Sequence, residues 1–447
     1  MDMPGKRCHH DGHFQQVMCD GNGGIMSLGH RSEGSVATAT AGLRGTIWNP
    51  DLLPGDVSLT AHALTTADGA SVTGYLFRRG GERTVVCSMH PRECVVTNFV
   101  VPEVLQGGCA MWVMAPRSPG NDLRLEHETA LLDLAAGQIF LRETMGFEYC
   151  ILQGTSGGGP LAAFYCQQAG RAPAARLTHS PGGRPVKLAS ATMPLPDGVI
   201  FMSAHPGQGQ LLLTQIDPAV TDEGDPFRID EGISAFSTAN GFRKPPESSS
   251  YAPEFLARYR AAQRARIVRI DAFARQLLER KADARRRSKA GGDEEAAALA
   301  AHSPIFQVWR TDADPRCFDL SLDPSDRAYG SVWGANPLVS NLGSIGFART
   351  CTPEGWLSNW SALSTNVSME ACAPDLAVPV QVIEFTGDNS VFPSDAARIF
   401  EAIGSADKER HAVHGNHHGQ PIVEGAANGQ RVAGQLIRNW LEHHRFR

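Results

Sequence analysis

The sequence predicts an α/β protein built on a mostly parallel sheet, and two observations carry this prediction. Short runs that resemble buried strands alternate along the chain with longer stretches of helical periodicity, and these runs are apolar along their whole length. Continuously apolar strands are typical of a parallel sheet whose two faces are both covered by helices. The chain has 447 residues, of which 42% are hydrophobic, so it can form one large domain that carries an insertion.

The expected elements begin with a β-hairpin, whose strands over 57–65 and 71–78 flank the turn Ala67-Asp68-Gly69. Buried strands follow over 84–89, 110–115, 149–153 and 198–203, with helices over 125–145 and 160–168. After a long interval the pattern resumes with a strand over 378–385, a helix over 394–403, a strand over 411–414 and a helix over 429–443. This alternation of strand and helix gives the parallel sheet its expected order along the chain.

Residues 217–375 break the alternation. Their longest helical stretch, over 253–290, has apolar residues at helical spacing on one face and many arginines on the other. We therefore predict a mainly helical cap or lid over 217–375, inserted into a core made of residues 51–216 and 376–447. Residues 1–50 are predicted to form a loose arm. Its cluster of Cys8, His9, His10 and His13 has no feature that fixes a metal geometry, so we expect no metal there.

Composition excludes several classes of protein. The net charge of -6 argues against a general nucleic-acid binder, and no apolar run approaches the roughly 20 residues that span a bilayer. The first residues contain no apolar stretch typical of a secretory signal. The ten cysteines form no CxxC pair and several lie in apolar runs, which favours buried thiols in a reducing compartment. We expect a cytoplasmic protein that neither binds nucleic acid nor inserts into membranes.

The most informative motif joins an expected strand to an expected helix. The strand over 149–153 runs into Gly154-Thr155-Ser156-Gly157-Gly158, a G-x-S-x-G sequence. Glycines around Ser156 permit a sharp turn that exposes the hydroxyl at the carboxyl edge of the sheet. The Gly157 N–H then points to where negative charge develops on an attacked carbonyl. The alternative is a glycine-rich turn with an ordinary serine, but the position between strand and helix favours a nucleophile.

A serine nucleophile needs a base that a third group holds in place, and the later strands supply candidates for both. The strand over 381–385 ends in Thr386-Gly387-Asp388, whereas the competing Asp395 falls inside the next helix. The strand over 411–413 leads to His417 and His418. The order Ser, Asp, His along the chain is the one expected of an α/β-hydrolase triad. We favour His417 as the base, because a ring residue and a glycine follow it, while His418 fits a G-x-x-H ending and remains the alternative.

A second oxyanion donor is expected in the loop Met89-His90-Pro91-Arg92, which follows an early strand. Because Pro91 has no N–H, the Arg92 N–H is the expected partner of the Gly157 N–H, and His90 is expected to brace the loop. A second His-Pro pair, His205-Pro206, follows the strand over 198–203; His205 either shapes the substrate pocket or only forms a turn. Trp333 and Trp356 either line a lid over an apolar acyl group or fill the core of the cap.

Through these motifs the chain resembles the α/β-hydrolase superfamily, and in particular its capped esterase-like branch, over residues 57–215 and 378–447. The resemblance implies a mostly parallel eight-stranded sheet with helices on both faces, a cap inserted after the sixth strand, acyl-enzyme chemistry, no metal and no cofactor. The expected function is that of a serine hydrolase acting on a small carboxylic ester or lactone.

The same triad also serves C–C bond hydrolases and acyltransferases, and the fold occurs in binding proteins that catalyse nothing. An intact Ser, Asp and His in the right order counts against the last alternative. The cap is also a candidate surface for contacts between copies of the chain.

Overall fold

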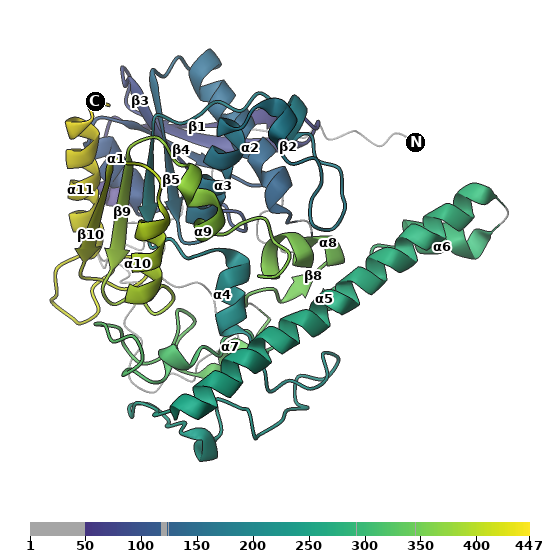
Figure 1. The fold of residues 1–447 in the computed structure, drawn as a ribbon. Helices are drawn as coiled ribbons and strands as arrows, with labels where there is room; N and C mark the ends of the chain where they lie inside the picture. The colour runs from purple at the N-terminus through teal and green to yellow at the C-terminus, as the bar shows by residue number, and fades with distance from the viewer. Residues whose placement is uncertain (1–49, 118–122, 124, 292, 345) are drawn as a thin grey trace, which may run out of the picture. The chain divides into compact units, whose positions relative to one another are not determined.

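The computed structural model describes residues 50–117, 123, 125–291, 293–344 and 346–447. The N-terminal arm and its histidine and cysteine cluster lie outside these residues. The described chain is built on an eight-stranded sheet in the order β1-β2-β4-β3-β5-β6-β9-β10 (Figure 1). The strands are β1 (Ser58–Thr65), β2 (Ser71–Arg78), β3 (Thr84–Met89), β4 (Ala110–Met114), β5 (Tyr149–Thr155), β6 (Gly198–Met202), β9 (Val380–Phe385) and β10 (Lys408–Val413). Strand β2 pairs antiparallel with β1 and β4, and all other neighbours pair in parallel.

Helices cover both faces of the sheet. Helices α1 (Val100–Gln106) and α11 (Gly429–His443) lie on one face, and α2 (His127–Ile139), α3 (Gly158–Gly170) and α10 (Pro393–Ala402) lie on the other. Successive side chains of a strand point to opposite faces, so Val86 packs with the first group of helices and Val85 with the second. All six residues of β3 are buried, which explains why the sequence of this strand is apolar without alternation. The chain therefore has the α/β-hydrolase fold that its sequence predicts.

The hairpin, the strands and the helices expected from the sequence are present, with shifts of a few residues at their ends. Among the described residues outside 217–375, two helices were not expected: α1 and α4 (Gln208–Gln215). Helix α1 is only seven residues long and six of them are buried, so no polar face gives it a helical period. Helix α2 continues through a π-helical turn, Phe140–Thr144, which accounts for the longer helix predicted to reach residue 145.

The segment between β6 and β9 contains most of the remaining elements. The long helix α5 (Pro253–Ala290) has the bounds that the sequence predicts, and its distal end pairs with α6 (Glu294–Ala301) beyond the sheet (Figure 1). The other elements are α7 (Pro337–Leu342), α8 (Pro353–Gly355), α9 (Met369–Cys372) and a small sheet of β7 (Phe306–Gln307) and β8 (Thr350–Cys351). Residues 217–237 and 318–336 contain no helix. The extent of the cap as a domain of its own stays a prediction.

Short helical turns complete the described chain. They are the 3₁₀ turns Pro50–Leu52, Pro173–Ala175, Leu188–Ser190, Thr238–Asn240, Pro315–Cys317 and Ala373–Asp375, and the π-helical turn Trp356–Trp360. Across the described residues, no helix is both long and apolar enough to cross a membrane. None of the eight cysteines in this part of the chain forms a disulfide, and seven of the eight are buried.

Candidate active site

Ser156 occupies a sharp turn between β5 and α3. Its φ of 53° lies in the left-handed region, which is rare for a residue with a side chain and marks a position that the surrounding structure must hold. The Ser156 N–H donates to the Met202 carbonyl at 3.1 Å, which ties the turn to β6. A Cβ at Gly154 would lie 2.5 Å from the Gly158 oxygen, and one at Gly158 would lie 2.6 Å from the Met89 oxygen. These two glycines are therefore needed for the close approach of the turn to its own helix and to β3.

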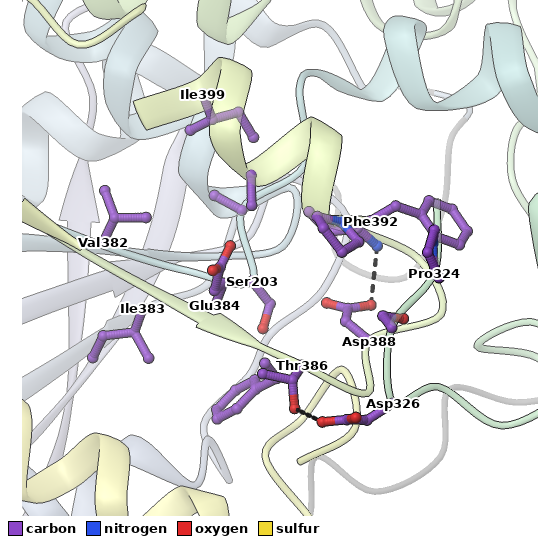
Figure 2. A pocket seen from close by; sticks show the side chains of 16 residues that line it. Ser203, Pro324, Asp326, Val382, Ile383, Glu384, Thr386, Asp388, Phe392 and Ile399 are labelled. Atoms are coloured by element: carbon purple, nitrogen blue, oxygen red, sulfur yellow. Dashed lines mark hydrogen bonds between the residues drawn. The ribbon is translucent and has the colours of Figure 1, made fainter. Parts of the chain in front are cut away.

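Asp388 and His417 are brought together at the same edge of the sheet. The His417 Nδ1–H donates to Asp388 Oδ2 at 2.7 Å, and both side chains are buried. Asp388 Oδ1 accepts hydrogen bonds from the N–H groups of Ser390 and Val391, at 2.7 and 3.0 Å, which fix the carboxylate in the turn after β9. Figure 2 shows Asp388 in this turn. Because Nδ1 carries the shared proton, the neutral ring leaves Nε2 unprotonated, as a general base requires.

The two competing residues have different surroundings. Both ring nitrogens of His418 are buried without a hydrogen-bond partner among the described residues, and burial lowers its pKa to about 3. Its ring lies 4.8 Å from that of His417 and lines the pocket beside Ser156. Asp395 binds Arg316 at 3.0 Å and Arg398 at 2.5 Å. Of the candidates for orienting carboxylate and base, the structure therefore pairs Asp388 with His417.

The pocket beside Ser156 is small. Its volume is about 40 Å³, and its walls include Met89, His90, Val95 and Phe99. A larger cavity of about 310 Å³ lies between β9, the start of α10 and residues 324–326, with Asp388 in its wall (Figure 2). Ser156 does not line that larger cavity. A reacting group at Ser156 is therefore confined to a narrow and largely apolar space.

The two expected oxyanion donors, the N–H groups of Gly157 and Arg92, differ in whether they already have a hydrogen-bond acceptor. No described residue accepts a hydrogen bond from the Gly157 N–H. The Arg92 N–H, in contrast, donates to His90 Nδ1 at 3.2 Å. The prediction that this N–H completes the oxyanion hole is therefore not met by the structure, because the group already has an acceptor within its own turn. His90 does brace the loop, as the sequence suggested.

The side chain of Arg92 connects this loop to the insertion. Its Nη2 donates to the Gly346 carbonyl at 3.1 Å, and its guanidinium lies 5.0 Å from the Trp360 ring centroid. Trp333 and Trp356 do not line the pocket beside Ser156. Both are buried in the apolar cluster that packs α4 against α5, and Trp356 Nε1 donates to Asp271 at 2.7 Å. These tryptophans fill the core of the insertion, because the long helix needs a large apolar surface to pack against, and their expected role in the pocket is not supported.

Further buried polar residues surround the Ser156 turn. His205 and Gln208, which follow β6, approach Gly157, and His127 at the start of α2 has an unpartnered Nε2 among the described residues. Burial lowers the pKa of His90 to about 3, that of His127 to about 4 and that of His205 well below its ordinary value. The Ser156 turn is thus surrounded by imidazoles that stay neutral at ordinary pH. No pattern in the sequence indicates His127 or Gln208, since both are brought in by tertiary packing.

A hydrogen bond from Ser203 holds the backbone of His417, the candidate base. Ser203, at the end of β6, has a φ of 45° and its hydroxyl donates to the His417 carbonyl at 2.9 Å. This bond joins the turn after β6 to the turn after β10, two strands away in the sheet. Among the described residues, no group of three or more His, Cys, Asp or Glu side chains is arranged to hold a metal ion.

No protein-family model and no curated protein matches the sequence. Among solved structures, an esterase of Pyrococcus furiosus aligns over 89% of this chain and 95% of its own, with 12% identity and a TM-score of 0.39. The esterase domain of a Rhodothermus marinus protein aligns over 86% and 98%, with 11% identity and a TM-score of 0.39. The α/β hydrolase GrgF of a Penicillium species aligns over 87% and 97%, with 11% identity and a TM-score of 0.41.

Proposed function

We propose that the protein is a serine hydrolase that cleaves a carboxylic ester or lactone through an acyl-enzyme. The observation that carries the proposal is the pairing of His417 with Asp388 at the sheet edge where Ser156 occupies its strained turn. A hydroxyl on such a turn, a buried imidazole with a fixed tautomer and an N–H at a helix start are the three parts of acyl transfer by serine.

In the proposed reaction, Ser156 Oγ attacks the substrate carbonyl carbon while His417 Nε2 takes the hydroxyl proton. The carbonyl oxygen becomes an oxyanion that the Gly157 N–H stabilises. The tetrahedral intermediate then expels the alcohol, which receives the proton from His417, and leaves an ester on Ser156. Water, deprotonated by the same imidazole, hydrolyses this ester and restores the hydroxyl. Asp388 stays ionised and stabilises the imidazolium in both halves of the reaction.

The pocket beside Ser156 favours a short acyl group. A space of about 40 Å³ has room for only a few water molecules, or a group of similar size, unless its walls move. We therefore expect faster turnover of acetyl than of long-chain acyl esters.

Hydrolysis of p-nitrophenyl acetate by the wild type and by Ser156→Ala tests the proposal. Removal of the nucleophile is expected to lower kcat by about 10⁴- to 10⁶-fold, with little change in the thermal unfolding temperature, since the glycines shape the turn. Ser190→Ala, at an exposed serine of a surface turn, is the matched control and is expected to keep wild-type activity. Activity near wild type in Ser156→Ala would refute the serine assignment. A wild type labelled at Ser156 by a fluorophosphonate but inert toward esters would instead favour C–C hydrolysis or acyl transfer.

A further inference from the structure

We propose that the His90 side chain, through its Nε2–H, donates the second hydrogen bond to the oxyanion. The inference rests on the proposed acyl-enzyme chemistry and deepens it. His90 then takes part in the reaction in addition to bracing its loop. It takes the place of the Arg92 N–H, which already donates a hydrogen bond to His90 Nδ1.

The first step of the argument is the tautomer of His90. Its Nδ1 accepts a hydrogen bond from the Arg92 N–H at 3.2 Å, so Nδ1 carries no proton. A neutral imidazole has one N–H, which must then be on Nε2. Burial holds the pKa of His90 at about 3, so the ring stays neutral at ordinary pH. Among the described residues this Nε2–H has no hydrogen-bond acceptor. His90 lines the pocket that contains Ser156, so the group is available to a bound substrate.

The second step is the position of Nε2. It lies 3.0 Å from the point that a Cβ at residue 157 would occupy. The nitrogen of any residue is about 2.5 Å from its own Cβ, so the Gly157 nitrogen and His90 Nε2 are at most about 5.5 Å apart. Two donors that share one oxygen at about 2.7–3.1 Å each must lie within about 6 Å of one another. One oxygen can therefore accept from both, and His90 lines the same small pocket as Ser156.

The third step is the glycine itself. Gly157 has φ -62° and ψ -17°, which any residue adopts, so its backbone does not require a glycine. A side chain at this position would instead crowd its neighbours, because His90 Nε2, His205 Nε2 and Gln208 Nε2 lie 3.0, 3.2 and 3.3 Å from its Cβ position. The absence of a side chain at 157 thus lets three polar nitrogens gather next to the oxyanion donor.

The turn after β6 repeats the arrangement of the His90 turn. The Gly207 N–H donates to His205 Nδ1 at 3.3 Å, as the Arg92 N–H does to His90, so His205 also carries its proton on Nε2. His205 is 2% exposed and does not line the pocket that contains Ser156. We therefore assign His205 as a positioning residue that confines the His90 ring, and His90 as the group that touches the reacting oxygen.

Steady-state kinetics of His90→Leu, His90→Gln and His205→Leu with p-nitrophenyl acetate test the assignment. Loss of one oxyanion donor is expected to lower kcat by about 10²- to 10³-fold with KM within about 3-fold, so His90→Leu should show this pattern. In His90→Gln the amide nitrogen lies near the position of Nε2, and it should recover at least about 10-fold of the loss. His205→Leu should lose about 10-fold or less.

Inhibition by a trifluoromethyl ketone, which forms a tetrahedral adduct, separates a donor from a merely structural residue. His90→Leu should weaken this inhibition by the same factor as kcat/KM. Gly157→Ala should lower kcat about 10-fold in the wild type, by displacing the His90 ring, and have little further effect in His90→Leu. Wild-type kcat in folded His90→Leu, no rescue by glutamine, or additive effects of the two substitutions would each overturn the role of His90 while leaving Ser156 as nucleophile. A wild type without ester turnover or Ser156 labelling would overturn both.

Discussion

The edge of the sheet that carries Ser156 and the segment inserted between β6 and β9 differ in their buried polar groups. At the edge these groups are imidazoles: His127 Nε2 and both nitrogens of His418 are buried without a partner among the described residues, and His90 lines the pocket. The insertion contains buried ion pairs, of Arg310 with Asp217 at 2.6 Å and of Arg266 with Glu223 at 2.6 Å, beside unpartnered atoms such as Asp312 Oδ1. Unsatisfied buried groups cost stability, and those at the edge surround the Ser156 turn, where a substrate can satisfy them.

Left-handed backbone conformations occur in both regions. At the edge they are at Ser156 and Ser203, in adjacent turns, and in the insertion they are at Arg310, Asp323 and Ala348. The insertion anchors its long helix through several contacts of one side chain, since Arg266 also donates to the carbonyls of Asp217 and Trp309 at 2.7 and 3.0 Å. Substitutions at the edge should therefore lower turnover, and substitutions in the insertion should lower stability.

The largest effect is expected from the pair of histidines at the edge. His417→Ala removes the base that Asp388 holds and should lower kcat by about 10⁴-fold or more. His418→Ala removes a ring that has no hydrogen-bond partner among the described residues, and kcat should change by less than about 10-fold. Turnover of p-nitrophenyl acetate by the two folded variants measures the difference. Similar mild losses in both would mean that neither histidine is the base.

The next effect concerns the insertion. Glu223 binds two arginines of α5, of which Arg266 is 1% exposed and Arg269 is 46% exposed at the side chain. Arg266→Ala should lower the free energy of unfolding by about 3–5 kcal/mol, because it removes the buried partner of a carboxylate. Arg269→Ala should cost less than about 1 kcal/mol. Urea unfolding measures both, and kcat of the folded fraction should be unchanged in both. Equal costs would show that burial does not distinguish the two pairs.

The pH dependence of stability should have opposite signs at two buried groups, His418 at the edge and Asp312 in the insertion. Burial holds the pKa of His418 at about 3, below its unfolded value of about 6.5, so the unfolded chain binds more protons between these values. The stability from this neutral ring is complete above about pH 6.5 and is lost as the pH falls. Burial raises the pKa of Asp312 in the insertion to about 6, so its contribution is complete below about pH 4 and is lost as the pH rises.

Urea unfolding between pH 4.5 and 6 tests these signs. His418→Phe should reduce the increase of the unfolding free energy with pH by about 1.4 kcal/mol per pH unit, and Asp312→Asn should steepen it by a similar amount. Changes of the same sign in the two variants would contradict the contrast between the regions.

The fold was predictable because burial determines the pattern of apolar residues in each element. Strand β3 is buried on both faces and is apolar along its whole length, whereas the helix Pro253–Ala290 is buried on one face and has apolar residues at helical spacing. Chain order also indicated that Asp388 would meet His417 or His418, since turns after parallel strands meet at one edge, and the structure pairs it with His417. Helix α1 was missed because it is buried nearly all round and has no polar face.

The gathering of polar nitrogens at Gly157 could not be predicted from the sequence, for a different reason. His90 and His205 each form a local His-Pro turn that the sequence does show, but their convergence depends on β3 and β6 lying on either side of β5. The engagement of the Arg92 N–H depends on the rotamer of His90, which no pattern of residues indicates. Trp333 and Trp356 could not be assigned between lid and core until the packing of α4 on α5 was known.

The most direct test of the central claim is covalent labelling by a fluorophosphonate, followed by mass spectrometry of the peptide that contains Ser156. We predict one adduct on Ser156 in the wild type, none in Ser156→Ala, and labelling slowed by about 10⁴-fold in His417→Ala, since phosphonylation uses the same base. An adduct on a different serine, or ester turnover that persists when Ser156 is unlabelled, would contradict the assignment of Ser156 as the nucleophile.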